Sequence, residues 1–176
     1  MEVKFKKLSD KAVMPTYAYA GDAGLDLTAV SVNSEINECG QFVIVYHTGL
    51  ALEIPKGYAG LLFPRSSIAN KSLVLTNCVG VIDSNYRGEV LLKFKNTTGD
   101  SVPAVYPIGA KIAQLIIIPY PTINLVESSE LSKTERGEGG YGSSDKETNS
   151  DDQELNNTET EVENMTSEST EQTPVE

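Results

Sequence analysis

Residues that bind metals or cross-link chains are scarce in this sequence. Its 176 residues include two cysteines, one histidine and no tryptophan. Cys39 and Cys78 are too few for a disulfide framework, and their spacing suits no metal site. His47 cannot form a metal cluster by itself, and we expect it to be a surface or strand histidine without a role in chemistry.

Long apolar runs are also missing. The longest one, Leu115 to Pro119, is short enough to be a buried strand. The N-terminal residues MEVKFKKLSD lack the apolar core of a signal peptide. We therefore expect a soluble, cytoplasmic protein that has no membrane partner.

A surplus of basic residues is absent too, because the net charge is −11. Eleven of the 25 acidic residues and one of the 14 basic residues lie in residues 145–176, which gives this segment −10 and leaves the first 144 residues at −1. A nearly neutral body has no excess of Lys or Arg to replace the counterions of a nucleic acid. We expect no nucleic-acid binding.

No segment keeps a 3.6-residue apolar period over three turns, which argues against long helices. Short runs rich in Val, Ile, Leu, Tyr and Phe, most of them separated by Gly, Pro, Asn or Asp, predict an all-β sandwich or barrel. The predicted strands are residues 3–8, 25–30, 42–46, 50–54, 60–63, 72–75, 79–82, 90–94, 111–118 and 122–126. Residues 66–71 predict a short helical turn capped by a serine.

The amino-acid composition changes from about Glu127, where apolar residues become sparse. We predict a β-barrel domain over residues 1–126, a flexible arm with a glycine-rich motif over 127–144, and a disordered acidic tail over 145–176, whose sparse apolar residues cannot offset the entropy of ordering. The tail is either a solvated extension or a binding segment with an unknown partner.

The stretch GVIDSNYRGEV, residues 80–90, places polar residues between two apolar runs. A hairpin bend there would leave Asp83 partly buried beside polar loop groups, where a carboxylate can deprotonate a water. The alternative is that Asp83 only hydrogen-bonds the amides of the turn.

Two further segments carry candidate anion or cation sites. In FPRSS, residues 63–67, a strand ends at proline, and Arg65 and Ser66 open a helical turn that either binds phosphate or is an ordinary capped turn. In AGDAGLDLTA, residues 20–29, an inward Asp26 needs a partner, either Arg65 or a hydrated cation.

The segment GEGGYG, residues 137–142, matches G-x-G-x-x-G but is not a dinucleotide fingerprint, since no strand precedes it and no helix follows. It is either a mobile lid, with Arg136 meeting a phosphate and Tyr141 lying over a planar ring, or a linker without function.

Five segments occur in a characteristic order: AGLDLTA (23–29), PRSS (64–67), GVIDSNYRGEV (80–90), GAKIAQLI (109–116) and RGEGGYGSS (136–144). Together they resemble the motifs of the trimeric dUTP pyrophosphatase (dUTPase) family. The resemblance implies a distorted jelly-roll β-barrel and a homotrimer whose active sites lie between subunits. It also implies Mg²⁺-dependent hydrolysis of dUTP to dUMP and pyrophosphate, which keeps uracil out of DNA and supplies dUMP for thymidylate synthesis.

The resemblance also implies roles for residues at matching positions. Asp83 would activate the attacking water, and Tyr86 would pack beneath the deoxyribose and exclude a 2′-hydroxyl. Asp26 would contact the water shell of the metal. The remaining residues would bind substrate: Asn77 and the backbone of Gly80, Val81 and Ile82 at uracil, Arg65, Ser66, Ser67 and Gln114 at phosphate, and Arg136 and Tyr141 in a lid from a third subunit.

Some positions depart from the family pattern. Asn85 stands where aspartate is common, Tyr141 where phenylalanine is commoner, and Lys111 where arginine is. Ser67 occupies a position where glycine is frequent, which matters if that position requires a positive φ. Two alternatives remain open: a dCTP deaminase of the same fold, and a regulatory binding protein that senses the nucleotide or uses its acidic tail.

Overall fold

The computed structural model describes residues 1–98 and 105–143, so the predictions made for Ser144 and for the tail 145–176 lie outside the described residues. The described chain contains nine strands and one short 3₁₀ helix. In chain order they are β1 (Lys4–Lys7), β2 (Leu25–Thr28), β3 (Ser31–Ile36), β4 (Phe42–Glu53), β5 (Tyr58–Pro64), η1 (Ser66–Asn70), β6 (Leu73–Leu75), β7 (Gly80–Ile82), β8 (Glu89–Asn96) and β9 (Lys111–Pro119). The predicted all-β class is confirmed.

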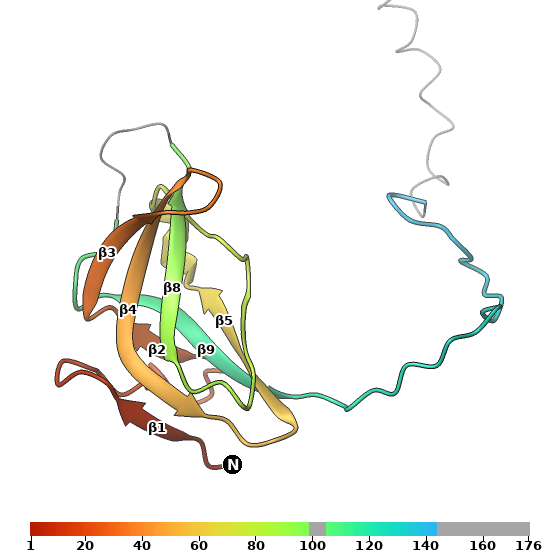
Figure 1. Cartoon of the computed structure of the whole chain (residues 1–176), viewed down its shortest axis with the longest axis horizontal. Helices are drawn as coiled ribbons and strands as arrows, with labels where there is room; N and C mark the ends of the chain where they lie inside the picture. The colour runs from red at the N-terminus through yellow and green to blue at the C-terminus, as the bar shows by residue number, and fades with distance from the viewer. Residues whose placement is uncertain (99–104, 144–176) are drawn as a thin grey trace, which may run out of the picture. The chain divides into compact units, whose positions relative to one another are not determined.

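The strands form two antiparallel sheets (Figure 1). One has the order β1-β4-β8-β6, with β3 also paired to β4, and the other has the order β2-β9-β5-β7. Strands β6 and β7 are therefore edge strands of different sheets. This arrangement decides where unpaired backbone groups are found.

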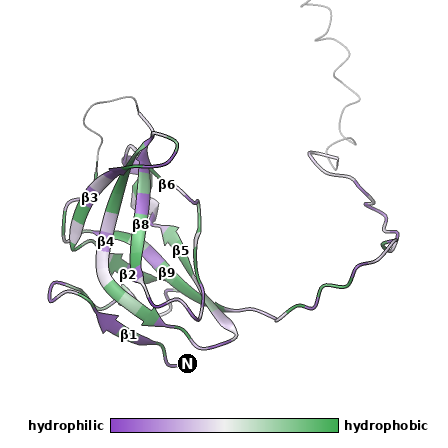
Figure 2. Ribbon diagram, in the orientation of Figure 1, coloured by the Kyte–Doolittle hydropathy of each residue, from purple (hydrophilic) through white to green (hydrophobic). Residues whose placement is uncertain are grey.

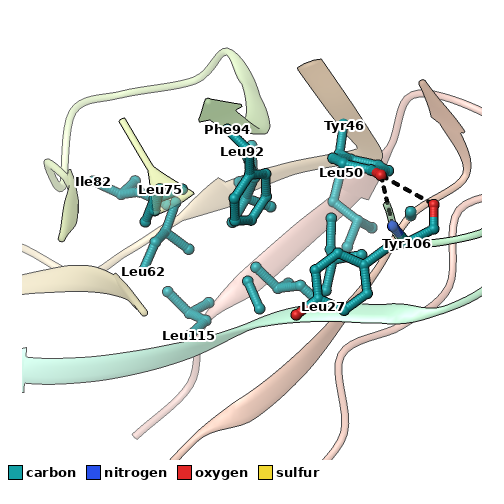
Figure 3. Packing of buried hydrophobic residues seen from close by; sticks show 14 of the residues in the cluster. Leu27, Tyr46, Leu50, Leu62, Leu75, Ile82, Leu92, Phe94, Tyr106 and Leu115 are labelled. Carbon is teal, nitrogen blue, oxygen red and sulfur yellow. Dashed lines mark hydrogen bonds between the residues drawn. The ribbon is translucent and has the colours of Figure 1, made fainter. Parts of the chain in front are cut away.

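The core lies between the two sheets, and Figure 3 shows the side chains that meet there. Leu27, Leu62, Ile82 and Leu115 come from one sheet, and Tyr46, Leu50, Leu75, Leu92 and Phe94 come from the other. All of them are buried, and burial of each such side chain stabilises the fold by about 1.5–3 kcal/mol. Alternating apolar residues in strands such as β8 supply this face.

Tyr46 is the largest fully buried side chain of the described residues, and its hydroxyl is hydrogen-bonded twice. It donates to the carbonyl oxygen of Tyr106 at 3.0 Å and accepts from the Tyr106 amide at 2.9 Å, as drawn in Figure 3. The Phe94 ring meets the Tyr46 ring edge-on at 5.8 Å between centroids. Burial raises the pKa of the Tyr46 phenol above its ordinary value, although the hydrogen bond donated by the Tyr106 amide acts in the opposite direction.

Several predicted elements differ from the structure. The two strands expected over 42–46 and 50–54 are one strand, β4, which continues through a bulge at Gly49, where φ is +67°. Strand β3 was not predicted, because SVNSEI is polar and mostly exposed, and only its six-residue pairing with β4 makes it a strand. No strand forms over 122–126 in this chain, where Ile123, Leu125 and Val126 are exposed.

The helical turn expected over 66–71 is η1, but the serine cap is wrong. Arg65 occupies the cap position, and no side chain makes a capping hydrogen bond. Ser67 adopts no positive φ, so serine is compatible with a backbone position where the family often has glycine.

The chain divides into two units, residues 1–124 and 125–176. Within the second unit, residues 125–143 contain neither strand nor helix. The domain boundaries expected from the sequence stay predictions. The described residues include no helix long and apolar enough to span a membrane.

Candidate active site

A cavity of about 350 Å³ opens at the edge strands β6 and β7. Because each strand pairs on one side only, its outer backbone N–H and C=O groups have no ladder partner among the described residues. The lining residues come from both sheets and from the segments joining them: Leu62, Leu75, Thr76, Asn77, Gly80, Val81, Ile82, Asp83, Tyr86, Glu89, Val90, Leu91 and Lys93.

The segment that carries Asp83 and Tyr86 is a crossing between sheets, so the expected hairpin is wrong. Strand β7 pairs with β5, whereas β8 pairs with β4 and β6, and no ladder joins β7 to β8 in the part of the chain described. Residues 83–88 therefore pass from one sheet to the other. Hydrophobic alternation predicts strands but not which sheet each one joins.

Asp83 is exposed, which corrects the expectation that it is partly buried. Strand β7 ends at Ile82, so the next residue leaves the core. The carboxylate makes no hydrogen bond within the described residues, while the Asp83 carbonyl accepts from the amide of Tyr86 at 3.1 Å. The carboxylate therefore does not bind the turn amides, and it is available to a ligand in the cavity.

The Tyr86 ring lies back over Gly88. A Cβ at Gly88 would collide with the ring and hydroxyl of Tyr86, so glycine is required for this placement. The Tyr86 hydroxyl donates to the carbonyl oxygen of Glu89 at 3.0 Å. Arg87 donates through Nη1 to the carbonyls of Ser84 (2.7 Å) and Tyr86 (2.8 Å), so its role is to hold the crossing segment.

A second cluster of polar residues centres on Asp26. Its Oδ1 lies 3.0 Å from Arg65 Nε, and its Oδ2 lies 2.7 Å from Lys111 Nζ. Arg65 Nη1 also donates to the Lys111 carbonyl at 3.4 Å. Two cations thus compensate one buried carboxylate, and the expectation that Asp26 needs a partner such as Arg65 is confirmed.

Gln114 lies in the same cluster, because it is in register with Asp26 on β2 and with Phe63 on β5. Its Nε2 donates to the Pro64 carbonyl at 3.3 Å. Gly24 leaves the room that this side chain occupies, since a Cβ there would lie 2.6 Å from Gln114 Oε1. Polar groups at the end of β5 are thereby held close to Arg65.

The two serines that follow Arg65 differ. Ser66 is exposed, whereas the Ser67 hydroxyl lies 3.4 Å from the Tyr106 hydroxyl. Ser67 therefore contacts the protein interior, and Ser66 is the more accessible of the two. Neither residue lines the cavity at β6 and β7.

The donor set fits a metal only through water. No group of three or more His, Cys, Asp or Glu gathers in the described part of the chain. Asp26 Oδ2 is buried, and its ion pair with Lys111 lacks hydrogen-bond geometry, so this oxygen can still accept a hydrogen bond. It suits a water of a hydrated cation, and it is not arranged as a direct ligand.

The glycine-rich segment belongs to the second unit. Arg136 Nε donates to the Gly139 carbonyl at 2.8 Å, and the Gly139 amide donates to the Arg136 carbonyl at 3.0 Å. Tyr141 is fully exposed and has a positive φ of 48°. The tyrosine ring is therefore free of the other described residues of its unit, 125–143.

The structure brings one group of the predicted residues into the cavity: Asn77, Gly80, Val81, Ile82, Asp83 and Tyr86. Asp26, Arg65 and Gln114 form the separate cluster. Gly88 and Glu89, which sequence reasoning did not single out, hold Tyr86 in place. Both stand in the quoted stretch 80–90, but nothing in the sequence shows that they contact the tyrosine.

An unpaired strand edge beside an aromatic ring and a free carboxylate defines a class of sites that bind a planar, hydrogen-bonding ligand. Comparison with known proteins gives the family. The dUTPase family model matches residues 10–145. The chain belongs to the dUTPase family, and the distorted jelly roll expected from the resemblance is confirmed.

Individual relatives agree with this assignment. The deoxyuridine 5′-triphosphate nucleotidohydrolase of Hydrogenobaculum sp. is 37% identical over 145 residues, which cover 82% of this chain and 98% of the relative. That of Gloeobacter violaceus is 39% identical and covers 82% and 97%. Among solved structures, a mutant dUTPase of Staphylococcus bacteriophage 80alpha with dUpNHpp has a TM-score of 0.69 and 30% identity, covering 81% of this chain and 98% of that one.

Proposed function

We propose that this protein hydrolyses dUTP to dUMP and pyrophosphate. One observation carries the proposal: the edge strand β7 and the exposed Asp83 and Tyr86 line the same cavity. The names of the relatives and the dUpNHpp bound to the phage enzyme support dUTP as the substrate. The family match gives no support to the dCTP deaminase alternative.

Uracil pairs with the backbone of Gly80, Val81 and Ile82 and with Asn77. An edge strand offers N–H and C=O groups in fixed positions, as a complementary base would. Cytosine carries a donor and an acceptor in the reverse positions on its hydrogen-bonding edge, so it would leave groups of the protein backbone unpaired. Such a mismatch can reduce activity by about 10⁴-fold. Thymine carries an additional methyl group, which the uracil site would have to exclude by its shape.

The sugar lies against Tyr86. The ring is held over Gly88 and bonded to Glu89, so it cannot retreat readily from an added 2′-hydroxyl. Steric exclusion by a fixed ring discriminates deoxyribose from ribose.

Asp83 is the general base. Its carboxylate takes a proton from a water as the water oxygen forms a bond to the α-phosphorus. The bond from the α-phosphorus to the bridging oxygen breaks, and pyrophosphate leaves with the electron pair. Arg65, Ser66, Ser67 and Gln114 bind the phosphate groups, and the charge that develops there is stabilised by Arg65 and by Arg136 of the lid.

Asp26 would hold the Mg²⁺ through water, using Oδ2, and the bound ion would neutralise phosphate charge. A phage phi11 dUTPase structure is described as coordinating a structural Mg(II) ion, which supports Mg²⁺ as the metal. A cytoplasmic location and the roles in dUMP supply and uracil exclusion go with this assignment.

The protein acts as a homotrimer with shared sites. In one chain the residues that bind base and sugar line the cavity, whereas Asp26 and Arg65 lie outside its lining. Sites built between subunits would unite the two groups, with Arg136 and Tyr141 closing over them as a lid.

Pyrophosphate release tests the proposal. The full chain is assayed with dUTP, dCTP, dTTP and UTP, each with Mg²⁺ and with EDTA. We expect turnover of dUTP alone, and only with Mg²⁺. Release of ammonia from dCTP, or equal turnover of all four nucleotides, would contradict the assignment.

A further inference from the structure

The only histidine of the chain lies between two side-chain oxygens from neighbouring strands. His47 on β4 has Nδ1 3.0 Å from Glu89 Oε2 on β8 and Nε2 2.6 Å from Asn33 Oδ1 on β3. The side chains of His47 and Glu89 are 31% and 24% exposed. An imidazole held at both nitrogens cannot turn without losing one of these contacts.

Glu89 is fixed to β4 by a second contact. Its Oε1 accepts from the amide of Gly49 at 2.7 Å. The pairing of β4 with β8 shifts between His47 and Ala51, and Gly49 lies in this bulge, so the carboxylate binds an amide at the point where the ladder is interrupted. Both carboxylate oxygens are therefore engaged on one strand.

The backbone of Glu89 holds the Tyr86 ring, which lines the cavity. The Glu89 carbonyl accepts the Tyr86 hydroxyl at 3.0 Å, and the ring lies against Gly88. The contacts thus run from His47 to the Glu89 carboxylate, and from the Glu89 carbonyl to Tyr86. They end three residues from Asp83, on the segment that crosses between the sheets and that Arg87 also holds.

We propose that His47 and Glu89 are positioning residues that fix Tyr86 and thereby set the discrimination between deoxyribose and ribose. The inference rests on the proposed dUTP hydrolysis. It gives a role to His47, for which the sequence analysis expected none. His47 does not line the cavity, and Glu89, which does, has its two carboxylate oxygens bound to His47 and to the Gly49 amide. Each acts through the bond between the Tyr86 hydroxyl and the Glu89 carbonyl.

The ratio of kcat/KM for dUTP to that for UTP tests the role. We expect His47→Ala and Glu89→Ala to lower this ratio by about 10-fold, the size expected when a charge-assisted hydrogen bond is lost. Glu89→Gln keeps an acceptor for the Gly49 amide, so it should restore most of the ratio. A variant that lowers Tm but keeps the wild-type ratio would show that the contacts are structural only.

A double-mutant cycle gives a second, independent test. If His47 acts through the Tyr86 hydroxyl, His47→Ala should change the ratio little in a Tyr86→Phe background, where that hydroxyl is absent. Additive effects of the two substitutions would overturn the proposal. His47→Ala leaves the Glu89–Gly49 contact in place, so the double-mutant cycle can be measured even if Glu89→Ala does not fold.

The matched control is Lys4→Ala. Lys4 Nζ on β1 lies 3.3 Å from Glu53 Oε1 on β4, so this ion pair joins two strands of the same sheet, and neither residue lines the cavity. The ratio should stay at the wild-type value. Wild-type protein without dUTP turnover would refute the proposed function itself, whereas an active protein with an unchanged ratio in all variants would refute the positioning role alone.

Discussion

Asp26 and Arg65 form an ion pair in which Oδ1 and Nε are 3.0 Å apart and the carboxylate side chain is only 9% exposed. Through Nε and Nη1 the guanidinium is fixed to β2 and to the Lys111 carbonyl on β9. Its Nη2 group makes no hydrogen bond to the described residues and is available to a ligand. Asp26 therefore orients Arg65, and Lys111 balances the charge that Asp26 retains.

Asp26→Ala should lower both stability and phosphate binding. Removing one member of a buried pair costs about 3–5 kcal/mol, but Arg65 and Lys111 are partly exposed here, so we expect roughly 1–3 kcal/mol. Urea unfolding measures the loss, and KM for dUTP should rise because Arg65 loses its orientation. Asp10→Ala, an exposed aspartate, is the control. Unchanged KM would contradict the orienting role.

Asp83→Asn should abolish most turnover without affecting the fold. A general base contributes about 10²–10⁴-fold to the rate, so kcat should fall by that factor. The side chain is exposed, and the free energy of unfolding should change by less than about 0.5 kcal/mol. Steady-state kinetics and urea unfolding check the two expectations, with Asp10→Asn as the matched substitution. Activity near the wild-type level would remove Asp83 from the mechanism.

Truncation separates the glycine-rich segment from the acidic tail. Deletion from Glu135 onward should nearly abolish turnover and leave the trimer folded, because Arg136 and Tyr141 are lost. Deletion of 146–176 alone should leave kcat/KM almost unchanged. Turnover and sedimentation measure the two properties. Full activity of the shorter chain would show that the lid assignment is wrong.

Tyr46→Phe should alter stability at alkaline pH. Because burial raises the pKa of Tyr46 in the folded state above its unfolded value, the folded state favours the neutral phenol. This contribution is fully present below the unfolded pKa, near 10.0, and it is lost as pH rises through the folded pKa. Unfolding free energies of both proteins should be measured from pH 7 to 11.

The variant should be less stable at pH 7 by about 1–3 kcal/mol, because the buried amide and carbonyl of Tyr106 lose their partner. It should then lose less stability than the wild type above pH 10. Parallel curves for the two proteins would contradict a shifted titration of Tyr46.

The strand content was predictable because apolar residues alternate in the segments that line the core, as in β8. The same rule missed β3, whose residues are mostly polar and exposed and which owes its structure to β4. It wrongly predicted a strand near Ile123, where the apolar residues have no partner strand in this chain. Figure 2 shows that β1 is mostly hydrophilic, yet the strand expected over residues 3–8 is confirmed there.

The sequence by itself determined the all-β class, the family and the residue types of the site, because these depend on local periodicity and on motifs that can be read along the chain. Only the tertiary structure decided that β7 and β8 belong to different sheets, that Asp83 is exposed, and that His47 meets Glu89. The physical reason is that strand pairing joins residues far apart in sequence. Which edges remain unpaired, and which side chains meet across them, is settled only when both sheets have formed.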